Sequence, residues 1–365
     1  MDFKSKPRVR IAIAGGGIAG LACAKALLNR GAAVTVYEAG AAGQGALWAS
    51  GGMLAGGFEC AEANASPAFA ELARRGMALW SDWAEDLGAA RIGYRVGGVI
   101  SPASDFAGLD WLDVLAERAG QLDIPYRRLR RLPECVRARS AIEFPEDGEL
   151  DNRLLGPRLA AFVREAGGHI LERTNVTVLA TDGDRVRVET NEASHNFDAV
   201  ILATGVAGQA LQPAEPALSA IRPVKGQMLS LQGPGEQLAF CLRARNAYVS
   251  QKTDGRFVIG ATSETGKSDT HVDDTAISAL RRNAETWLPG LEGREVTESW
   301  AGIRPGTPDN LPILGAGALP GVYLALGLYR NGVLLAPAVG ELMADAILSG
   351  TAPPVDFGAA RFFQR

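Results

Sequence analysis

Hydrophobic and polar residues follow two different periods in the first part of the chain. A β-branched apolar run over residues 9–14 ends at Gly15, and apolar residues then recur at helical spacing over residues 18–28. A second apolar run, residues 33–37, follows Gly31. The pattern predicts a strand, a helix and a second strand, which is how a doubly wound α/β sheet begins.

The same two periods recur along the rest of the chain. Helical spacing with start and stop signals predicts helices over residues 66–87, 105–118, 154–166, 273–287 and 337–348. Apolar or alternating runs predict strands over residues 91–101, 176–180, 185–190, 197–205, 223–231, 247–250, 256–261 and 321–326. We expect a Rossmann-like domain of residues 1–87, 151–219 and 301–365, with an inserted cap domain of mixed or antiparallel sheet formed by residues 88–150 and 220–300.

A glycine motif lies at the first junction of strand and helix. Gly15, Gly17 and Gly20 complete G-x-G-x-x-G, whose glycines permit the turn, the approach of a pyrophosphate and close packing of helix on strand. Glu38 ends the second strand about 20 residues later, where a carboxylate can accept hydrogen bonds from both ribose hydroxyls of an adenosine. It would repel a 2′-phosphate. The motif therefore predicts a dinucleotide with a free ribose, FAD or NAD.

Three other segments predict backbone in contact with a ligand. Residues 39–57 are rich in glycine and alanine but include Trp48 and Met53, which are costly to expose, so we expect them to lie against a bound cofactor. The apolar strand over residues 197–205 ends in Thr204-Gly205, at the sheet edge where doubly wound folds bind ligands. Residues 327–337 lead from a glycine turn into a helix whose start, expected at Pro337, can face an anion.

Composition excludes several classes of protein. The chain has 365 residues, of which 37 are basic and 41 acidic. No run of like charges indicates binding to nucleic acid or to a membrane surface. No signal peptide precedes the first strand and no apolar run is long enough to span a bilayer, so we expect a cytoplasmic protein. The few cysteines and histidines lack metal-ligand spacing, and no metal site is predicted; they are Cys23, Cys60, Cys135, Cys241, His169, His195 and His271.

Seven short segments, spread over nearly the whole chain, share one resemblance. In order they read GGGIAG, ASGGMLAG, VILATG, VKGQMLS, GRFVIGAT, AGIRPGT and YRNGVLLAP. In this order and spacing they resemble the FAD-dependent D-amino-acid oxidase superfamily, and within it the glycine oxidases of the thiamine-biosynthesis type. The resemblance implies an FAD-binding domain of the glutathione-reductase type joined to a substrate-binding cap.

The resemblance also implies an activity and a set of site residues. The family oxidises a small amino acid at Cα, passes the electrons through FAD to O₂, and releases an imine that hydrolyses or serves thiamine thiazole synthesis. Its substrate contacts fall on Tyr248, Arg304 and Arg330. Together with the glycine motif and Thr204-Gly205, its cofactor contacts give Gly15, Gly17, Ile18, Ala19, Gly20, Glu38, Ala39, Ala46, Leu47, Gly51, Gly52, Met53, Val176, Thr204, Gly205, Leu328, Tyr329, Arg330, Asn331, Gly332, Val333 and Leu334.

Physical chemistry supports the roles of the three substrate residues. A guanidinium can hold a carboxylate by two parallel hydrogen bonds, which lysine cannot do, and we expect Arg304 to be this clamp. Tyr248 can donate a phenolic hydrogen bond to the same carboxylate, and Arg330 can orient the amine through its backbone carbonyl. Non-covalent FAD is expected, because the terminal motifs contain no cysteine or histidine. A homo-oligomer is compatible with the sequence.

Departures from the family pattern leave the substrate open. Asn246 and Ser263 stand where the glycine oxidases have histidine and methionine, and residues 249–255, VSQKTDG, lack the usual Pro-Arg. The changed pocket wall could admit sarcosine, a small D-amino acid or an amine carried by another protein. A flavin dehydrogenase that reduces a quinone or carrier also stays open. An NAD(P)H-using enzyme is disfavoured because no second G-x-G-x-x-G follows, and a non-enzymatic module is disfavoured by the Arg304 and Tyr248 pair.

Overall fold

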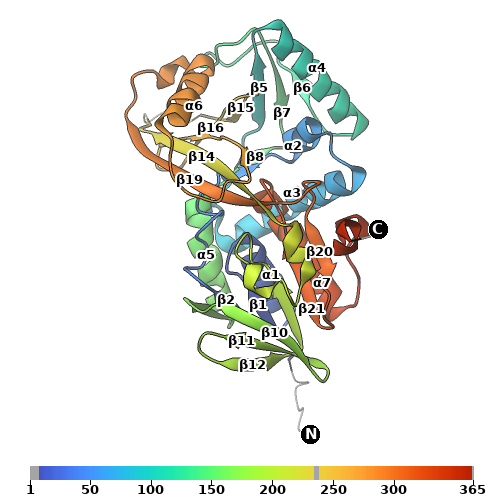
Figure 1. Ribbon diagram of the computed structural model, residues 1–365. Coiled ribbons are helices and arrows are strands. Elements are labelled where there is room, and N and C mark those ends of the chain that lie inside the picture. Colours follow the sequence, from blue (N-terminus) through green and yellow to red (C-terminus); the bar gives the residue numbers. More distant parts are fainter. Residues whose placement is uncertain (1–7, 234–237, 364–365) are drawn as a thin grey trace. The chain divides into compact units, whose positions relative to one another are not determined.

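The computed structural model describes residues 8–233 and 238–363, and the chain divides into two compact units (Figure 1). The first unit comprises the described parts of Met1–Trp48, Gly156–Pro223 and Arg304–Arg365. The second unit comprises the described parts of Ala49–Leu155 and Val224–Ile303. The chain passes between the units four times, and three of these passages lie inside an element: α5 (Asn152–Glu165), β14 (Arg222–Leu231) and β19 (Val296–Gly306).

A six-stranded sheet forms the centre of the first unit, in the order β20-β21-β13-β1-β2-β9. Its strands are β1 (Arg10–Ala14), β2 (Ala33–Glu38), β9 (His169–Glu172), β13 (Ala199–Leu202), β20 (Ile313–Ala316) and β21 (Val322–Leu326). All neighbouring pairs are parallel except β20–β21. Because β1 lies between β2 and β13, the strand order reverses direction there, and ligands bind at the carboxyl ends of strands at such a point.

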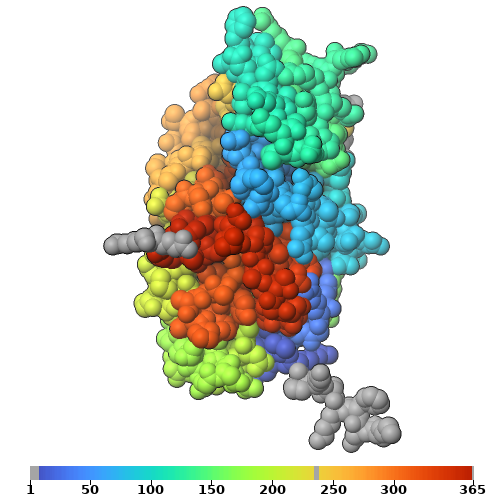
Figure 2. All heavy atoms as spheres, turned by 90° about the vertical axis from the view of Figure 1, so that its right-hand side faces the viewer, coloured from blue at the N-terminus to red at the C-terminus, as the bar shows by residue number. Residues whose placement is uncertain are grey.

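Two helices of the first unit pack tightly on each other. These are α1 (Ile18–Asn29), which connects β1 to β2, and α7 (Gly332–Leu348), which follows β21. A Cβ atom on Gly340 would lie 2.6 Å from the carbonyl oxygen of Ala22, so a larger residue would push the helices apart. At the end of α1, Arg30 forms ion pairs with Glu341 and Asp345 of α7. Figure 2 shows the last part of the chain, in red, gathered on one face of the molecule.

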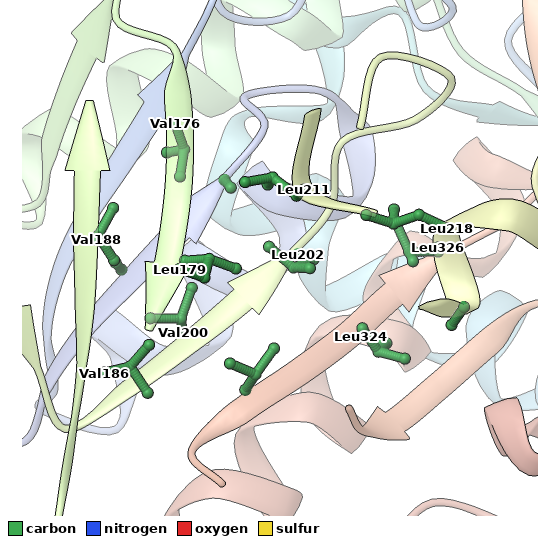
Figure 3. Packing of buried hydrophobic residues seen from close by; sticks show 14 of the residues in the cluster. Val176, Leu179, Val186, Val188, Val200, Leu202, Leu211, Leu218, Leu324 and Leu326 are labelled. Carbon is green, nitrogen blue, oxygen red and sulfur yellow. The ribbon is translucent and has the colours of Figure 1, made fainter. Parts of the chain in front are cut away.

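A small antiparallel sheet packs on the parallel strands of the first unit. It consists of β10 (Val176–Asp182), β11 (Arg185–Thr190) and β12 (Ser194–Phe197), and short 3₁₀ turns follow at Gln209–Leu211, Pro216–Ala220, Val355–Phe357 and Ala359–Phe362. Buried aliphatic side chains join the two sheets, among them Leu179, Val186, Val200 and Leu324 (Figure 3). Each such side chain contributes about 1.5–3 kcal/mol when fully buried. The cluster therefore fixes the start of β10, where Val176 lies, relative to the sheet.

The second unit is built on a nine-stranded mixed sheet, in the order β18-β14-β17-β16-β15-β5-β7-β6, with β19 paired to β14. Beyond β14 and β19, its strands are β5 (Val99–Ala103), β6 (Arg127–Arg128), β7 (Ser140–Phe144), β15 (Cys241–Arg243), β16 (Tyr248–Gln251), β17 (Phe257–Gly260) and β18 (Glu264–Thr265). β15 pairs with β5 in parallel, whereas β15–β16 and β5–β7 are antiparallel. A second, three-stranded sheet contains β3 (Met53–Leu54), β4 (Arg95–Val96) and β8 (Gly148–Glu149).

The helices of the second unit begin at capping side chains. They are α2 (Gly56–Ala63), α3 (Pro67–Leu87), α4 (Phe106–Gln121) and α6 (Asp274–Trp287), with 3₁₀ turns at Ala89–Ile92 and Pro289–Leu291. Ser66, Asp105 and Asp273 accept hydrogen bonds from first-turn amides of α3, α4 and α6. The buried Asp147 caps α2 by accepting from Gly57 N at 2.7 Å and Phe58 N at 2.9 Å. Such caps satisfy amides that have no partner within the helix.

The fold class predicted from the sequence is confirmed, an α/β protein with a parallel sheet and an inserted mixed sheet. Several details differ. The strand expected over residues 91–101 is broken into a 3₁₀ turn, β4 and β5, because Gly93 and Gly98 adopt positive φ of 60° and 80°. The helix expected to start at Pro337 begins five residues earlier, at Gly332. Within the described ranges, no helix is both long and apolar enough to cross a bilayer.

A further difference is the position of residues 49–87, which the sequence predicts as part of the FAD-binding domain. They belong to the second unit. The ring of Phe58, in α2, lies 6.2 Å from that of Trp111 in α4 and 6.0 Å from that of Phe144 in β7. The chain therefore leaves the first unit after Trp48, inside the glycine-rich segment, and not at the end of α3.

Candidate active site

The turn between β1 and α1 uses its three motif glycines in different ways. Gly15 has φ +113°, and a Cβ atom there would lie 2.3 Å from the carbonyl oxygen of Ala203. A Cβ atom on Gly20 would lie 1.8 Å from the carbonyl oxygen of Gly15. Around Gly17, in contrast, a Cβ atom would meet nothing within 4 Å. Gly15 and Gly20 thus permit close packing of the protein, whereas Gly17 leaves open space at the N-terminus of α1, where a phosphate group fits.

Glu38 ends β2 beside this turn. Its two carboxylate oxygens accept hydrogen bonds from Gly16 N and Gly40 N, each at 2.7 Å, and these bonds fix the side chain. A carboxylate has about four lone-pair positions, so each oxygen can accept one more hydrogen bond. Two ribose hydroxyls can use these positions, as predicted for an adenosine.

A pocket lies at the carboxyl ends of β1, β2 and β13, enclosing about 460 Å³ with its open mouth included. The structure brings together five predicted cofactor residues in it: Gly15, Glu38, Ala39, Val176 and Thr204. The Oγ1 atom of Thr204 is buried and has no hydrogen-bond partner among the described residues. A buried hydroxyl without a partner is costly, and a polar ligand would satisfy it. The pocket therefore fits the adenosine end of a dinucleotide.

The pocket has further walls that the sequence did not predict. They are Ala14, Tyr37, Thr174, Asn175, Ala207, Gly208, Ala210 and Leu211. A signal existed for Gly208, because a small residue close after Thr204-Gly205 suggests a near approach of backbone; its Cβ would lie 2.4 Å from the hydroxyl of Thr204. Thr174 and Asn175 directly precede the predicted Val176 and carry no pattern of their own.

Other predicted cofactor residues of the first unit lie in or next to the segments that meet at the glycine motif. Ala46 and Leu47 belong to a turn that is anchored by a hydrogen bond from Gly43 N to Gly16 O. Gly205, with φ +58°, continues from Thr204, and Ile18 and Ala19 form the first turn of α1.

The segment after β21 brings a second helix N-terminus to the same place. Residues 327–331 form a turn with positive φ at Gly327 and Tyr329, and α7 then starts at Gly332. A Cβ atom on Gly332 would lie 3.2 Å from Cγ2 of Ile18, so the first turns of α7 and α1 are neighbours. The first turn of α7 contains Gly332 itself, with Val333 and Leu334, while Pro337 lies inside the helix. Two helix N-termini side by side favour the binding of negative charge.

The two predicted substrate arginines lie on adjacent segments of the first unit. Arg304 is a half-buried residue of β19, and Arg330 is an exposed residue of the turn before α7. Tyr329 N donates a hydrogen bond of 3.0 Å to Pro305 O. This bond links the residue after Arg304 to the residue before Arg330, so the two backbone segments are held together.

In the second unit, the side chain of Tyr248 lies against Gly51, the first residue of the predicted cofactor segment. Its hydroxyl would be 2.3 Å from a Cβ atom on Gly51, and its ring carbon Cζ would be 2.6 Å from a Cβ atom on Gly260. The hydroxyl also contacts Met228 Sδ at 3.4 Å. Gly51 thus lies against the tyrosine, any side chain at position 51 would displace the ring, and Gly52 and Met53 follow Gly51 directly in the chain.

Comparison with known proteins identifies the family. Residues 10–346 match the DAO family, described as FAD dependent oxidoreductase. The chain is 32% identical to the glycine oxidase of Pseudomonas aeruginosa over 95% of this chain and 96% of that protein. It is 33% identical to the bifunctional protein ThiO/ThiG of a Nostoc species over 94% of this chain, and it spans 53% of that longer protein.

A solved structure agrees with these sequence matches. The crystal structure of glycine oxidase from Geobacillus kaustophilus superposes with a TM-score of 0.89 at 30% identity, covering 97% of this chain and 99% of that one. The cofactor of this family, FAD, fits the pocket, because its adenosine has free ribose hydroxyls that can donate hydrogen bonds to Glu38. The chain belongs to the DAO family of FAD dependent oxidoreductases.

Proposed function

We propose that the protein is a flavin-dependent oxidase of glycine or a similarly small amine. The observation that carries this proposal is similarity over nearly the full chain to two glycine oxidases, those of P. aeruginosa and G. kaustophilus. In the proposed reaction glycine loses two electrons and two protons, giving an imine that water hydrolyses to glyoxylate and ammonia. O₂ takes up both electrons and both protons and becomes H₂O₂.

The chain's own residues hold the cofactor at its adenosine and pyrophosphate parts. Glu38 accepts hydrogen bonds from the ribose, and the open backbone at Gly17 receives the pyrophosphate. When bound, FAD supplies the hydride acceptor at flavin N5 and the route for electrons to O₂. The amides at the start of α7, Gly332–Leu334, stabilise negative charge that develops during the reaction.

Arg304, Tyr248 and Arg330 are proposed to hold the substrate. Arg304 binds the carboxylate through two parallel hydrogen bonds, and Tyr248 donates a third. The backbone carbonyl of Arg330 accepts a hydrogen bond from the amine and so fixes the direction of the Cα–H bond. These residues act by positioning the substrate more than by acid–base chemistry, because the substrate Cα and the hydride acceptor must be held about 3–3.5 Å apart.

The name of one relative suggests how the imine product is used. One relative is named as a bifunctional ThiO/ThiG protein, so a chain similar to this one is joined there to a ThiG part. We propose that the imine made here supplies thiazole synthesis for thiamine, and that a ThiG-type protein is the partner that consumes it.

The proposed function is tested by purifying the protein, recording its visible spectrum, and measuring H₂O₂ under air with glycine, sarcosine and D-alanine. We expect a flavin spectrum and steady peroxide release with glycine. Bleaching of the flavin without peroxide would instead indicate a dehydrogenase. Peroxide release only with sarcosine or D-alanine would show that one of these amines, and not glycine, is the substrate. Rapid flavin reduction by NADPH without any amine would contradict the oxidase proposal.

Replacing Tyr248 by phenylalanine is expected to raise the KM for glycine about tenfold or less. The change removes one neutral hydrogen-bond donor, worth about 0.5–1.5 kcal/mol, and keeps the ring that packs against Gly51 and Gly260. Steady-state kinetics on the flavin-loaded variant measures the effect. An inactive and colourless Tyr248→Phe protein would show that the hydroxyl is needed for folding or FAD binding, and not for substrate.

A further inference from the structure

A buried lysine lies beside the predicted cofactor segment of the second unit and has no part in the proposed reaction. Lys252 is 3% exposed and follows β16, four residues after Tyr248. Its ammonium donates hydrogen bonds to Gly51 O at 2.7 Å and Leu150 O at 2.8 Å, and it lies 3.4 Å from Glu149 Oε2. A lysine has three N–H donors, and all three are used here.

The charge of Lys252 is balanced inside the second unit. Glu149, itself 2% exposed, also accepts hydrogen bonds from Arg95 and Ser250. Burial opposes ionisation of this carboxyl, but Lys252, Arg95 and the hydroxyl of Ser250 outweigh it and lower the pKa of Glu149. The buried ion pair therefore stays charged, and breaking one partner of such a pair is costly.

Gly51 is held from two directions by Tyr248 of β16 and by Lys252, which follows that strand. On one side the hydroxyl of Tyr248 leaves no room for a side chain at position 51, and on the other the ammonium of Lys252 binds the Gly51 carbonyl. The backbone of Gly52 is fixed as well, because its carbonyl accepts from Leu150 N at 2.8 Å. The peptide that joins Gly51 to Gly52 thus has a single orientation.

This orientation has a consequence for the amide of Gly52. In a trans peptide the C=O and N–H bonds point in opposite directions, so a Gly51 carbonyl aimed at Lys252 turns the Gly52 N–H away from it. Gly52 is buried, yet its N–H has no acceptor among the residues that the structure describes. Buried backbone amides are almost always paired, so this donor indicates a ligand.

We propose that Lys252 is a positioning residue, which holds the Gly51 carbonyl so that the Gly52 N–H is presented to the flavin. The proposal rests on the proposed function in one respect, that residues 51–53 contact FAD. It also gives a role to the segment VSQKTDG, which departs from the family pattern and contains this lysine. Lys252 acts through the backbone and needs no contact with the substrate.

The test is the FAD affinity of the Lys252→Met variant. Apoprotein is titrated with FAD, the dissociation constant is obtained from flavin fluorescence, and the visible spectrum of the bound flavin and the melting temperature of the apoprotein are recorded. We expect the dissociation constant to rise about tenfold or more, as for a lost bond to a buried amide, with a shifted flavin spectrum. Lys252→Arg, which keeps the charge and the donors, should restore most of the affinity.

Lys225→Met is the matched control. Lys225 is also 3% exposed and lies in the second unit, but it pairs with Asp269 and not with the cofactor segment. We expect the FAD dissociation constant of the Lys225→Met variant to stay within twofold of the wild-type value. Equal losses in both lysine variants, or a wild-type dissociation constant and spectrum in Lys252→Met, would overturn the proposal.

A second variant and the choice of readout keep the test decisive. If Lys252→Met does not fold, the double variant Lys252→Met with Glu149→Gln removes both charges together and should show the same loss of FAD affinity. The readout is FAD binding and not turnover. A wild-type protein that binds FAD but does not oxidise glycine would contradict the proposed function alone and leave this test intact.

Discussion

Replacing Gly17 by alanine is expected to weaken FAD binding at least about tenfold, which is about 1.4 kcal/mol, while the apoprotein stays as stable as wild type. The backbone of Gly17 has φ −78°, which any residue adopts, and a Cβ atom there meets no protein atom within 4 Å. The added methyl group would occupy only the space through which a pyrophosphate reaches the helix N-terminus. Fluorescence titration with FAD and a thermal melt of the apoprotein measure the two quantities.

Two other glycine variants isolate this effect. Gly20→Ala would place a methyl group 1.8 Å from a carbonyl oxygen, so we expect it to destabilise the apoprotein of the first unit as well as to lose FAD. Gly120→Ala, in α4 of the second unit, also fills open space and should leave FAD affinity unchanged. A Gly17→Ala protein with wild-type FAD affinity would show that the open space at position 17 is not a phosphate site.

The parts of the fold that the sequence predicted are those decided by neighbours along the chain. The glycine motif and Glu38 form one strand, turn, helix and strand, and their spacing alone places Glu38 beside the turn. The hairpin of β10 and β11 follows from its turn residues, and the starts of α3, α4 and α6 follow from capping side chains. Short-range rules such as these depend on few residues and survive in the tertiary structure.

The features that the sequence did not predict depend on residues far apart in the chain. Nothing near Lys252 shows that its ammonium will meet Gly51, two hundred and one positions earlier. The crossing of the chain after Trp48 is decided by packing of Phe58 on Trp111 and Phe144, which no local pattern contains. The sequence places the start of α7 too late for another reason: a proline favours the first turn of a helix and disfavours its interior, yet Pro337 lies inside α7.

The candidate site divides in the same way. Five of its predicted cofactor residues meet in one pocket. Gly15, Glu38, Ala39 and Thr204 lie at or just after the carboxyl ends of strands of the six-stranded sheet, and Val176 begins β10 of the small antiparallel sheet. The other walls, such as Thr174 and Leu211, are supplied by connections whose course only the folded chain reveals. Tyr248 and the two arginines lie in different units, and their joint action on one substrate stays a proposal.

Replacing Arg304 by alanine is expected to raise the KM for glycine about tenfold to more than a hundredfold, with the flavin still bound. The reason is that a hydrogen bond between charged groups contributes about 1.5–3 kcal/mol, and a bidentate clamp makes two such bonds in a partly desolvated site. Arg304 does not line the pocket that fits the adenosine end of FAD, so we expect the FAD content to stay unchanged. Steady-state kinetics at saturating O₂ and the absorbance ratio of flavin to protein measure both effects.

Two arginine variants make the result specific to a carboxylate clamp. Arg304→Lys keeps the positive charge but not the parallel pair of donors, and it should give a KM between those of wild type and Arg304→Ala. Arg222→Ala removes an exposed arginine of the same unit and should leave both kcat and KM unchanged. Wild-type kinetics in Arg304→Ala would refute the clamp, whereas loss of FAD from that variant would assign Arg304 a structural role. A large rise in KM with an intact flavin spectrum is the outcome that only a substrate-binding guanidinium explains.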